Sequence, residues 1–260
     1  MDNTQQEDDK RFHHYHGNNI MLSEDNTVAH RTADFGNSQI YSSKPLFPGE
    51  LFLVEIIENQ RRGWCGHLDI GLSHKNPNVL ASNPEVQEIG ESYLPFPRVE
   101  WTIGISKREI QVARKNILYR NSIHIPKNVS YDSKNIRTCR GVIPRYCLKS
   151  SRAQDGKIDA SDVGSRIGVM FIPTSETIAD MHVIINGIDE GPLYTDIPYR
   201  DAPIYATINL RGSTKKIKII QLSYVPSLKA ACRNSIIQSM PESIIHRLQL
   251  PKELKKFLLL

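Results

Sequence analysis

The chain has 260 residues, of which 39% are hydrophobic and 23% charged, with 15 glycines, 15 prolines and a net charge of +5. This composition is typical of a folded, turn-rich protein with room for one sizeable core or two small ones. No apolar run approaches the roughly 18 residues that a membrane-spanning helix needs. The polar start MDNTQQEDDKR lacks the apolar centre of a signal peptide, and four widely spaced cysteines give no disulfide framework. We therefore expect a cytoplasmic protein in which residues 1–11 are disordered.

From residue 12 onward the sequence predicts short β-strands separated by turns. We predict strands at residues 50–57, 67–72, 101–105, 166–172, 181–185, 205–210 and 216–222. Several of them alternate apolar and polar residues, and Asn186-Gly187 after one of them is a strong hairpin signal. Many short strands without helical periods between them predict a mainly β protein, an antiparallel β-sandwich.

Positive charge is concentrated in one segment, residues 107–159, whose fold the pattern does not define. From Lys107 to Lys157 the chain carries 13 Lys or Arg residues and three acidic residues, whereas the rest carries 20 basic and 25 acidic residues. This segment suits an acidic partner or a phosphoinositide headgroup, and its few tyrosines do not favour nucleic acid. The alternative is a solvated surface loop. In that case, reversing Arg137, Arg140 and Arg145 to Glu changes the melting temperature little.

The residues that most resemble a metal site are His13, His14 and His16, together with Cys65 or His67. Adjacent residues of a strand point to opposite faces, and no spacing such as Cys-x2-Cys or His-Glu-x-x-His occurs. We therefore expect neither a metal ion nor a cofactor. Without a Cys/His ladder the chain has no RING domain of its own, and it has no nucleophile elbow, so we expect a non-catalytic protein.

The strand region carries a set of motifs that occur together in one family. They are Phe12-His-x4-Asn18-Asn-Ile-Met-Leu-Ser23, Ala29-His-Arg31, Pro45-Leu-Phe-Pro-Gly-Glu50 and Trp64-Cys-Gly-His-Leu-Asp-Ile-Gly71, then Arg166-Ile-Gly-Val169, Ala179-Asp-Met-His182 and Ile185-Asn-Gly-Ile-Asp-Glu-Gly-Pro192. The motifs resemble the two halves of a Neuralized homology repeat, with the basic segment inserted between them. The resemblance implies a SPRY-like β-sandwich over residues 12–225.

The last 34 residues predict three short amphipathic helices. Ser227 is a good N-cap, and Leu228, Cys232 and Ile236 recur every four residues, which places them on one narrow stripe of a helix. Pro241 ends this helix, and further apolar runs follow at residues 244–248 and 254–258. Segments this short cannot bury enough surface to be stable alone, so they must dock on something.

The tail, residues 226–260, resembles a SOCS box. The pattern Ser-Leu-x-x-x-Cys-x-x-x-Ile at residues 227–236 is similar to an elongin-binding BC box. One Neuralized repeat joined to a SOCS box resembles the ubiquitin-ligase adapters of the Neuralized-like family. The resemblance implies that the repeat recruits a protein for ubiquitination and proteasomal degradation, while Leu228, Cys232 and Ile236 bind elongin C, with elongin B. The alternative is a binding module whose C-terminal helices only cap their own domain.

The second part of the tail resembles a cullin box at about residues 248–258. The resemblance implies that Leu248, Leu250 and Pro251 contact a cullin of the cullin-5 type with its RING subunit, and that the protein acts in muscle cells. Many cullin-5 boxes carry Leu-Pro-x-Pro, whereas this chain has Leu-Gln-Leu-Pro, which leaves cullin 2 open. Pro251 suits the first position of a helix, and we expect Leu254 and Phe257 to pack the box together.

The substrate is not identified by any motif. Sandwich domains bind partners through the loops between their strands. The candidate loops are short and polar, and they contain Asn18 and Asn19, Arg61 and Arg62, and Ser175.

Overall fold

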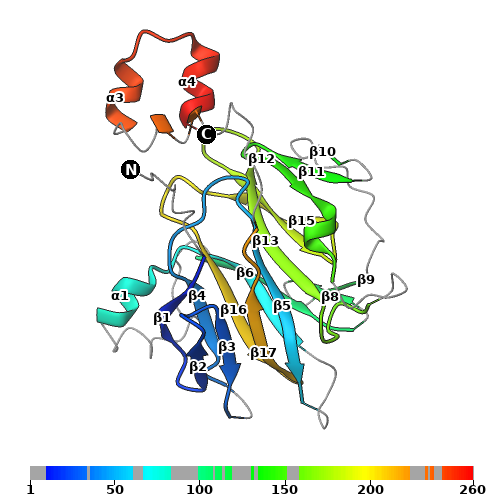
Figure 1. Ribbon diagram of the computed structural model, residues 1–260. Coiled ribbons are helices and arrows are strands. Elements are labelled where there is room, and N and C mark those ends of the chain that lie inside the picture. Colours follow the sequence, from blue (N-terminus) through cyan, green and yellow to red (C-terminus); the bar gives the residue numbers. More distant parts are fainter. Residues whose placement is uncertain are drawn as a thin grey trace, which may run out of the picture.

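Two antiparallel sheets of seven strands pack face to face in the computed structural model and form the body of the molecule (Figure 1). The first sheet has the order β1 (Phe12–His16), β4 (Gln39–Ser42), β16 (Tyr205–Arg211), β6 (His67–Ser73), β7 (Glu100–Ile105), β8 (Glu109–Val112) and β9 (Lys115–Leu118). The second has the order β15 (Ile188–Ile197), β14 (Ala179–Ile185), β13 (Arg166–Pro173), β5 (Phe52–Asn59), β17 (Thr214–Ile219), β3 (Val28–Arg31) and β2 (Ile20–Ser23). The predicted antiparallel sandwich is therefore confirmed.

The structure describes residues 10–33, 36–60, 67–82, 99–107, 109–112, 115–118, 130–131, 134–150, 158–222, 232–233, 235–236 and 242–259. The remaining described elements are a third sheet of β10 (Ser130–Tyr131), β11 (Asn135–Thr138) and β12 (Gly141–Pro144), the 3-10 helix η2 (Arg145–Leu148), and the helices α1 (Pro77–Ser82), α3 (Glu242–Arg247) and α4 (Lys252–Leu259). No helix within the described ranges is long and apolar enough to cross a membrane.

The strands predicted from the sequence are confirmed, and their ends differ from the prediction by at most three residues. The predicted hairpin at Asn186-Gly187 joins β14 to β15, with φ of 48° at Asn186 and 80° at Gly187. Positive φ at both central residues is what a tight turn between twisted strands requires, and Asn-Gly adopts it most easily. This dipeptide therefore fixes the register of the hairpin.

The strands differ in how many of their faces are buried, and their sequences explain the difference. In β7, residues Trp101, Ile103 and Ile105 point into the main core and the residues between them are partly exposed. Strand β13 is buried on both faces: Phe171 joins the main core, whereas Met170 lies in a second apolar cluster. An alternating sequence thus suits a strand with one wet face, and a continuous apolar run suits a covered strand.

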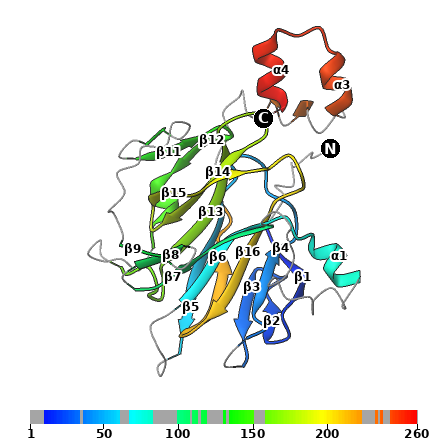
Figure 2. The same ribbon diagram turned by 180° about the vertical axis from the view of Figure 1, so that it is seen from behind.

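The basic segment supplies that cover. Strands β8 and β9 extend the first sheet, whereas β10–β12 and η2 lie over the outer face of the second sheet (Figure 2). The second cluster consists of Leu51, Leu53, Ile136, Ile143, Leu148, Met170, Ile172 and Ile184. Its members at positions 136, 143 and 148 come from the basic segment, for which a solvated surface loop was the alternative interpretation. That interpretation is wrong for residues 134–150.

Arg145, one of the three arginines named for charge reversal, joins the inserted layer to the sandwich. Its Nε donates a hydrogen bond of 2.8 Å to the carbonyl of Gly187, at the β14–β15 turn, and its backbone N–H donates to the carbonyl of Lys134. Arg137, by contrast, is exposed. The three arginines proposed for reversal to Glu therefore differ in role. Reversing all three removes the hydrogen bond from Arg145 that joins the inserted layer to the sandwich.

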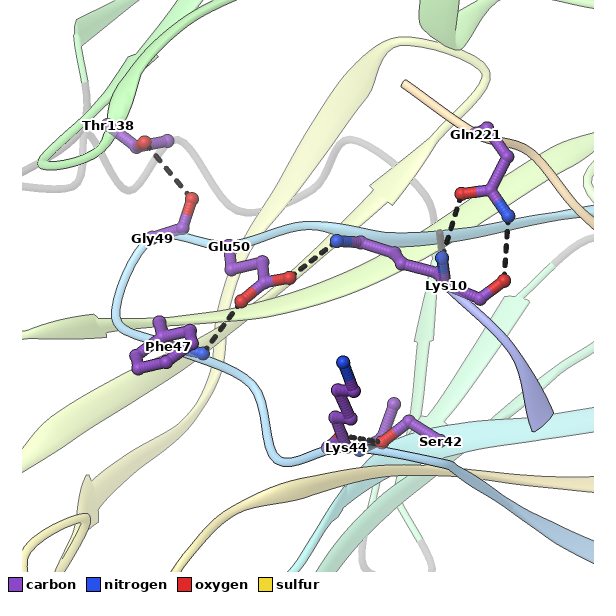
Figure 3. Close-up of polar contacts among 9 residues, drawn as sticks. Lys10, Ser42, Lys44, Phe47, Gly49, Glu50, Thr138 and Gln221 are labelled. Atoms are coloured by element: carbon purple, nitrogen blue, oxygen red, sulfur yellow. Dashed lines mark hydrogen bonds and ion pairs between the residues drawn. The ribbon is translucent and has the colours of Figure 1, made fainter. Parts of the chain in front are cut away.

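The loop at residues 43–51 crosses from the first sheet to the second at one end of the sandwich. Gly49 has φ of 72°, and its N–H donates to the carbonyl of Phe171 at 2.8 Å. Its own carbonyl accepts a hydrogen bond from Thr138 Oγ1 at 3.1 Å (Figure 3). A Cβ atom at position 49 would lie 2.7 Å from Sγ of Cys139. Only glycine therefore meets both the backbone conformation and the close approach of the inserted layer.

The role of the inserted layer in folding is tested by Ile143→Ala. Ile143 is 3% exposed in the second cluster, so its truncation should lower the free energy of unfolding by about 2–5 kcal/mol. Val142→Ala, at the neighbouring and partly exposed position, is the matched control and should cost less than about 1 kcal/mol. Urea denaturation of both variants measures the difference. Equal, small losses would show that the layer does not contribute to the core.

The close approach at Gly49 is tested by comparing two Gly→Ala variants of nearly equal φ. Gly36 has φ of 73° with open space around its Cβ position, so Gly36→Ala should cost only the left-handed backbone, roughly 1–2 kcal/mol. Gly49→Ala should cost about 1–3 kcal/mol more, because the added methyl meets Cys139. Thermal or urea unfolding gives the comparison, and equal losses at the two sites would contradict the packing argument.

Candidate functional site

The C-terminal tail lies beyond the end of the sandwich at which β12 lies, and both views show it there (Figures 1 and 2). Helices α3 and α4 pack on each other, with Ile245 2% exposed and Leu258 4% exposed. These side chains are the interior of the described tail. Residues 232–233 and 235–236, within the predicted first helix, are also helical.

The segment between the two helices is a tight turn. The N–H of Leu250 donates to the carbonyl of Leu248 at 2.9 Å, and the carbonyl of Pro251 accepts from the N–H groups of Leu254 and Lys255, each at 3.0 Å. Pro251 thus directly precedes the helix instead of occupying its first position. A proline suits this place because the first N–H groups of a helix have no partner within it.

The residues expected to bind partners differ in exposure. Cys232 and Pro251 are exposed, while Ile236, Leu248 and Leu250 are partly exposed. Leu228 lies outside the described residues. The described members are therefore at the surface, as a docking site for a second protein requires.

Two further apolar residues of the tail reach solvent, with Ile244 45% and Leu254 46% exposed. The expectation that Leu254 packs the box together is wrong, because Ile245 and Leu258 are the buried residues of this pair of helices. Leu254 instead adds to the apolar surface that the tail presents. The side chain of Phe257 lies outside the described part of the chain.

The exit from the last strand toward the tail is held by side chains at the end of the sandwich (Figure 3). The amide of Gln221 bonds the backbone of Lys10 twice: its Oε1 accepts from the N–H at 3.0 Å, and its Nε2 donates to the carbonyl at 2.7 Å. The Lys10 ammonium forms an ion pair with Glu50, and the other carboxylate oxygen of Glu50 accepts from the N–H of Phe47 at 2.9 Å. The end of the sandwich at Gln221 is therefore tied to Lys10, just before β1, and through it to the 43–51 loop.

The first helical segment of the tail also meets the sandwich, through Arg233. This side chain is 8% exposed, although the neighbouring Cys232 is exposed. Burial lowers the pKa of the Arg233 guanidinium, and the positive charges of Arg140 and Arg200 lower it further. One side of this segment therefore faces the end of the sandwich and the other faces solvent.

The residues predicted for substrate binding are not brought together. Gly49 bonds Phe171 at the end of the sandwich where β5 starts, and Gln60, just past the other end of β5, bonds the carbonyl of Ser213. Ser175, in the β13–β14 turn, lies at the first end. Asn19 lies at the second, bonded to residues 36 and 37 beside the β16–β17 turn. Arg61 and Arg62 are outside the described residues.

Two of these candidates also have structural roles. The side-chain amide of Asn19 donates to the carbonyl of Gly36 at 2.8 Å, and Ser175 Oγ accepts from the N–H groups of Thr177 and Ile178. Such bonds stabilise turns. Asn18 is exposed beside Asn19.

Of the three histidines near the start, His13 packs within the sandwich, whereas His14 is exposed and His16 is partly exposed. His13 is buried, and its Nε2 lies 3.1 Å from Asn78 Oδ1 of α1. Burial lowers the pKa of His13. Within the described ranges, no group of three or more His, Cys, Asp or Glu residues is placed to hold a metal ion.

Three residues of the junction, Lys10, Gln221 and Arg233, did not stand out in the sequence. A single Gln that bonds a backbone 211 positions away has no periodicity or spacing to reveal it. Arg233 is next to the cysteine of the BC box pattern, and a basic residue beside an apolar helical stripe is normally solvated. Only the folded arrangement shows that it is buried.

Comparisons with known proteins agree with these features. The family model described as Neuralized matches residues 12–221, and the SOCS box model matches residues 224–259. Neuralized-like protein 2 of Homo sapiens is 34% identical over 269 residues, which cover 95% of this chain and 90% of that protein. A mouse protein named E3 ubiquitin-protein ligase NEURL3 is 27% identical over 73 residues, 26% of this chain and 28% of the relative.

The fold has a counterpart among solved structures. The crystal structure of the Drosophila melanogaster neuralized NHR1 domain superposes with a TM-score of 0.50 and 16% identity, covering 82% of this chain and 98% of that domain. At this identity the likeness concerns the fold alone. Because the family model spans most of the chain and the human relative is matched over nearly its full length, the chain belongs to the Neuralized family, with one Neuralized domain followed by a SOCS box.

Proposed function

We propose that this chain is the substrate-recognition adapter of an elongin B/C–cullin–RING ubiquitin ligase. The observation that carries the proposal is a helical tail beyond the end of the sandwich whose apolar side chains Ile244 and Leu254 reach solvent. The SOCS box match supports ligase recruitment, and the ubiquitin-ligase name of the mouse relative supports the same pathway. The proposed location is the cytoplasm, and Cys139, Cys147 and Cys232 are free thiols.

The proposed mechanism is geometric. The tail binds elongin C, elongin B accompanies it, and the cullin with its RING subunit brings a ubiquitin-charged enzyme to the complex. The sandwich holds the substrate, so that substrate lysines meet the ubiquitin thioester at high effective concentration. No catalytic residue of the chain takes part.

The proposed contacts follow the exposure of the tail. We assign Leu228, Cys232 and Ile236 to elongin C, since the last two are at least partly exposed in the free chain. The turn between α3 and α4 carries Leu250 and Pro251, which we assign to the cullin together with Leu248. We prefer a cullin-5-type scaffold to cullin 2.

A second candidate is a protein-binding module whose tail only caps its own domain. The burial of Arg233 beside the end of the sandwich favours some docking of this kind. The exposed Cys232 on the same segment favours a further partner. Affinity capture from cells, followed by mass spectrometry for elongins, separates the two candidates.

Replacing the apolar residues of the BC box with aspartate should abolish elongin capture. Burying a side chain such as Leu contributes roughly 1.5–3 kcal/mol, and placing an unpaired carboxylate in the interface costs more, so Leu228→Asp should weaken binding by about 100-fold or more. Cys232→Asp should act in the same direction. Because Cys232 is exposed in the free chain, its variant should melt at the wild-type temperature. Lys252→Asp, at an exposed position of α4, is the control; undiminished capture by Leu228→Asp would contradict the assignment.

The cullin contact is tested by Leu250→Asp combined with Pro251→Ala. Alanine keeps the carbonyl that accepts from Leu254 and Lys255, so α4 should persist while cullin binding weakens by about tenfold or more. Complexes with elongins B and C are titrated against cullin 5 and cullin 2 in parallel, with Gln249→Ala as the control. Unchanged cullin affinity, or a preference for cullin 2, would overturn this part of the proposal and leave the elongin contact intact.

A further inference from the structure

An exposed aromatic ring with an arginine stacked on it lies at the end of the sandwich where β5 starts, and we call this pair the Phe47–Arg140 patch. Phe47 belongs to the 43–51 loop and is 53% exposed. The Cζ of Arg140, in the turn between β11 and β12, lies 5.0 Å from the centre of the Phe47 ring. Stacking on a ring orients a guanidinium without using its N–H donors. Within the described ranges, no hydrogen bond or ion pair occupies the Arg140 guanidinium. The patch therefore offers an apolar face beside charged donor groups.

The loop that presents Phe47 is held by its own turn and by the inserted layer. Pro48 and Gly49 are the central residues of this turn, and φ of 72° at Gly49 fits a type II turn. The N–H of Glu50 donates to the carbonyl of Phe47 at 3.0 Å, and the Glu50 carboxylate accepts from the N–H of Phe47 at 2.9 Å. From the inserted layer, Thr138 Oγ1 donates to the carbonyl of Gly49 at 3.1 Å. A surface fixed in this way loses little conformational entropy when a ligand binds to it.

The acidic first residues of the chain lead into Lys10, which is fixed beside the same loop. Residues 1–9 contain no Lys or Arg and four acidic residues: Asp2, Glu7, Asp8 and Asp9. The backbone of Lys10 bonds Gln221 twice, and its ammonium forms an ion pair with Glu50 (Figure 3). The other carboxylate oxygen of Glu50 bonds Phe47. Nine residues span up to roughly 30 Å when extended, so a segment that begins at Lys10 is long enough to reach the patch.

We propose that the acidic segment, residues 1–9, docks on the Phe47–Arg140 patch with one of its carboxylates bonded to the guanidinium. The two oxygens of a carboxylate match the paired N–H groups of an arginine, and such charged hydrogen bonds are stronger than neutral ones. A segment of the same chain has an advantage over a separate molecule, because its tether gives it an effective concentration in the millimolar range. The contact does not depend on whether the tail binds elongin C.

The docked segment limits access to the patch. A partner protein that presents its own acidic group to Arg140 must first displace the segment. If the segment occupies the patch half of the time, the affinity for such a partner falls to about half of its value for the open patch. The first nine residues therefore act as a competitor that is built into the chain.

The test compares backbone amide NMR spectra of the full chain and of a variant that lacks residues 2–9. The deletion should shift the signals of Phe47 and of residues 138–141, and it should leave those of Gln60 and Ser213, at the other end of the sandwich, unchanged. Replacing the four acidic residues with their amides should give the same shifts: Asp2→Asn, Glu7→Gln, Asp8→Asn and Asp9→Asn. In Arg140→Gln the deletion should have no effect at the patch. Arg137→Gln, exposed on the same hairpin, is the control and should respond to the deletion as the parent chain does.

A synthetic peptide of residues 1–9 provides a second measurement. Added to the deletion variant, it should move the signals of the patch back toward those of the full chain, and its affinity should fall at least about tenfold in Arg140→Gln, which removes the charged hydrogen bonds. The proposal fails if the deletion leaves the signals of the patch unchanged, or if Arg140→Gln binds the peptide as well as the parent does. It also fails if these signals change with protein concentration in the full chain, since a second copy would then be the occupant.

Discussion

Strands β5 and β13 bury side chains on both of their faces, and the arrangement of the rest of the molecule follows from this. One face packs on the first sheet, and the other must be covered because leaving residues such as Leu53 and Met170 in water would cost about 1.5–3 kcal/mol for each side chain. The layer made by β10–β12 and η2 provides the cover. The turn between β11 and β12 consequently lies against the 43–51 loop, where the absence of a side chain at Gly49 leaves room for Cys139. The inserted layer therefore reaches the end of the sandwich beyond which the tail lies.

The sequence predicted those elements whose signals are local. Alternating residues predict a strand with one buried face, as at residues 67–72 and 101–105. A continuous apolar run predicts a buried strand, as at residues 50–57, and Asn186-Gly187 predicts its own tight turn. The breaks before and after α3 were also predictable, because Pro241 and Pro251 interrupt two short apolar runs. In all these cases the deciding interaction lies within a few residues of the pattern that reveals it.

The inserted layer and the junction could not be predicted in the same way. Ile136, Ile143 and Leu148 are separated by polar and basic residues, so charge dominates the local composition while the apolar minority determines the packing. The bond from Arg145 to Gly187 and the clamp between Lys10 and Gln221 join residues that are distant in sequence. Asn19 and Ser175 resembled one another as polar loop residues, yet they lie at opposite ends of the sandwich. The composition of a loop does not show at which end of the sandwich the loop lies.

The tail is the part of the chain whose own interactions are weakest. Helices of six and eight residues fall below the roughly 12–15 residues at which an isolated helix is even marginally stable in water, and few of their described side chains are buried. Its structure must therefore depend on docking, either to the sandwich through Arg233 or to a partner through the opposite side of the same segment. The burial of Arg233 and the exposure of the neighbouring Cys232 show how one short segment serves both requirements: its buried side docks on the sandwich, and its other side is left open to solvent.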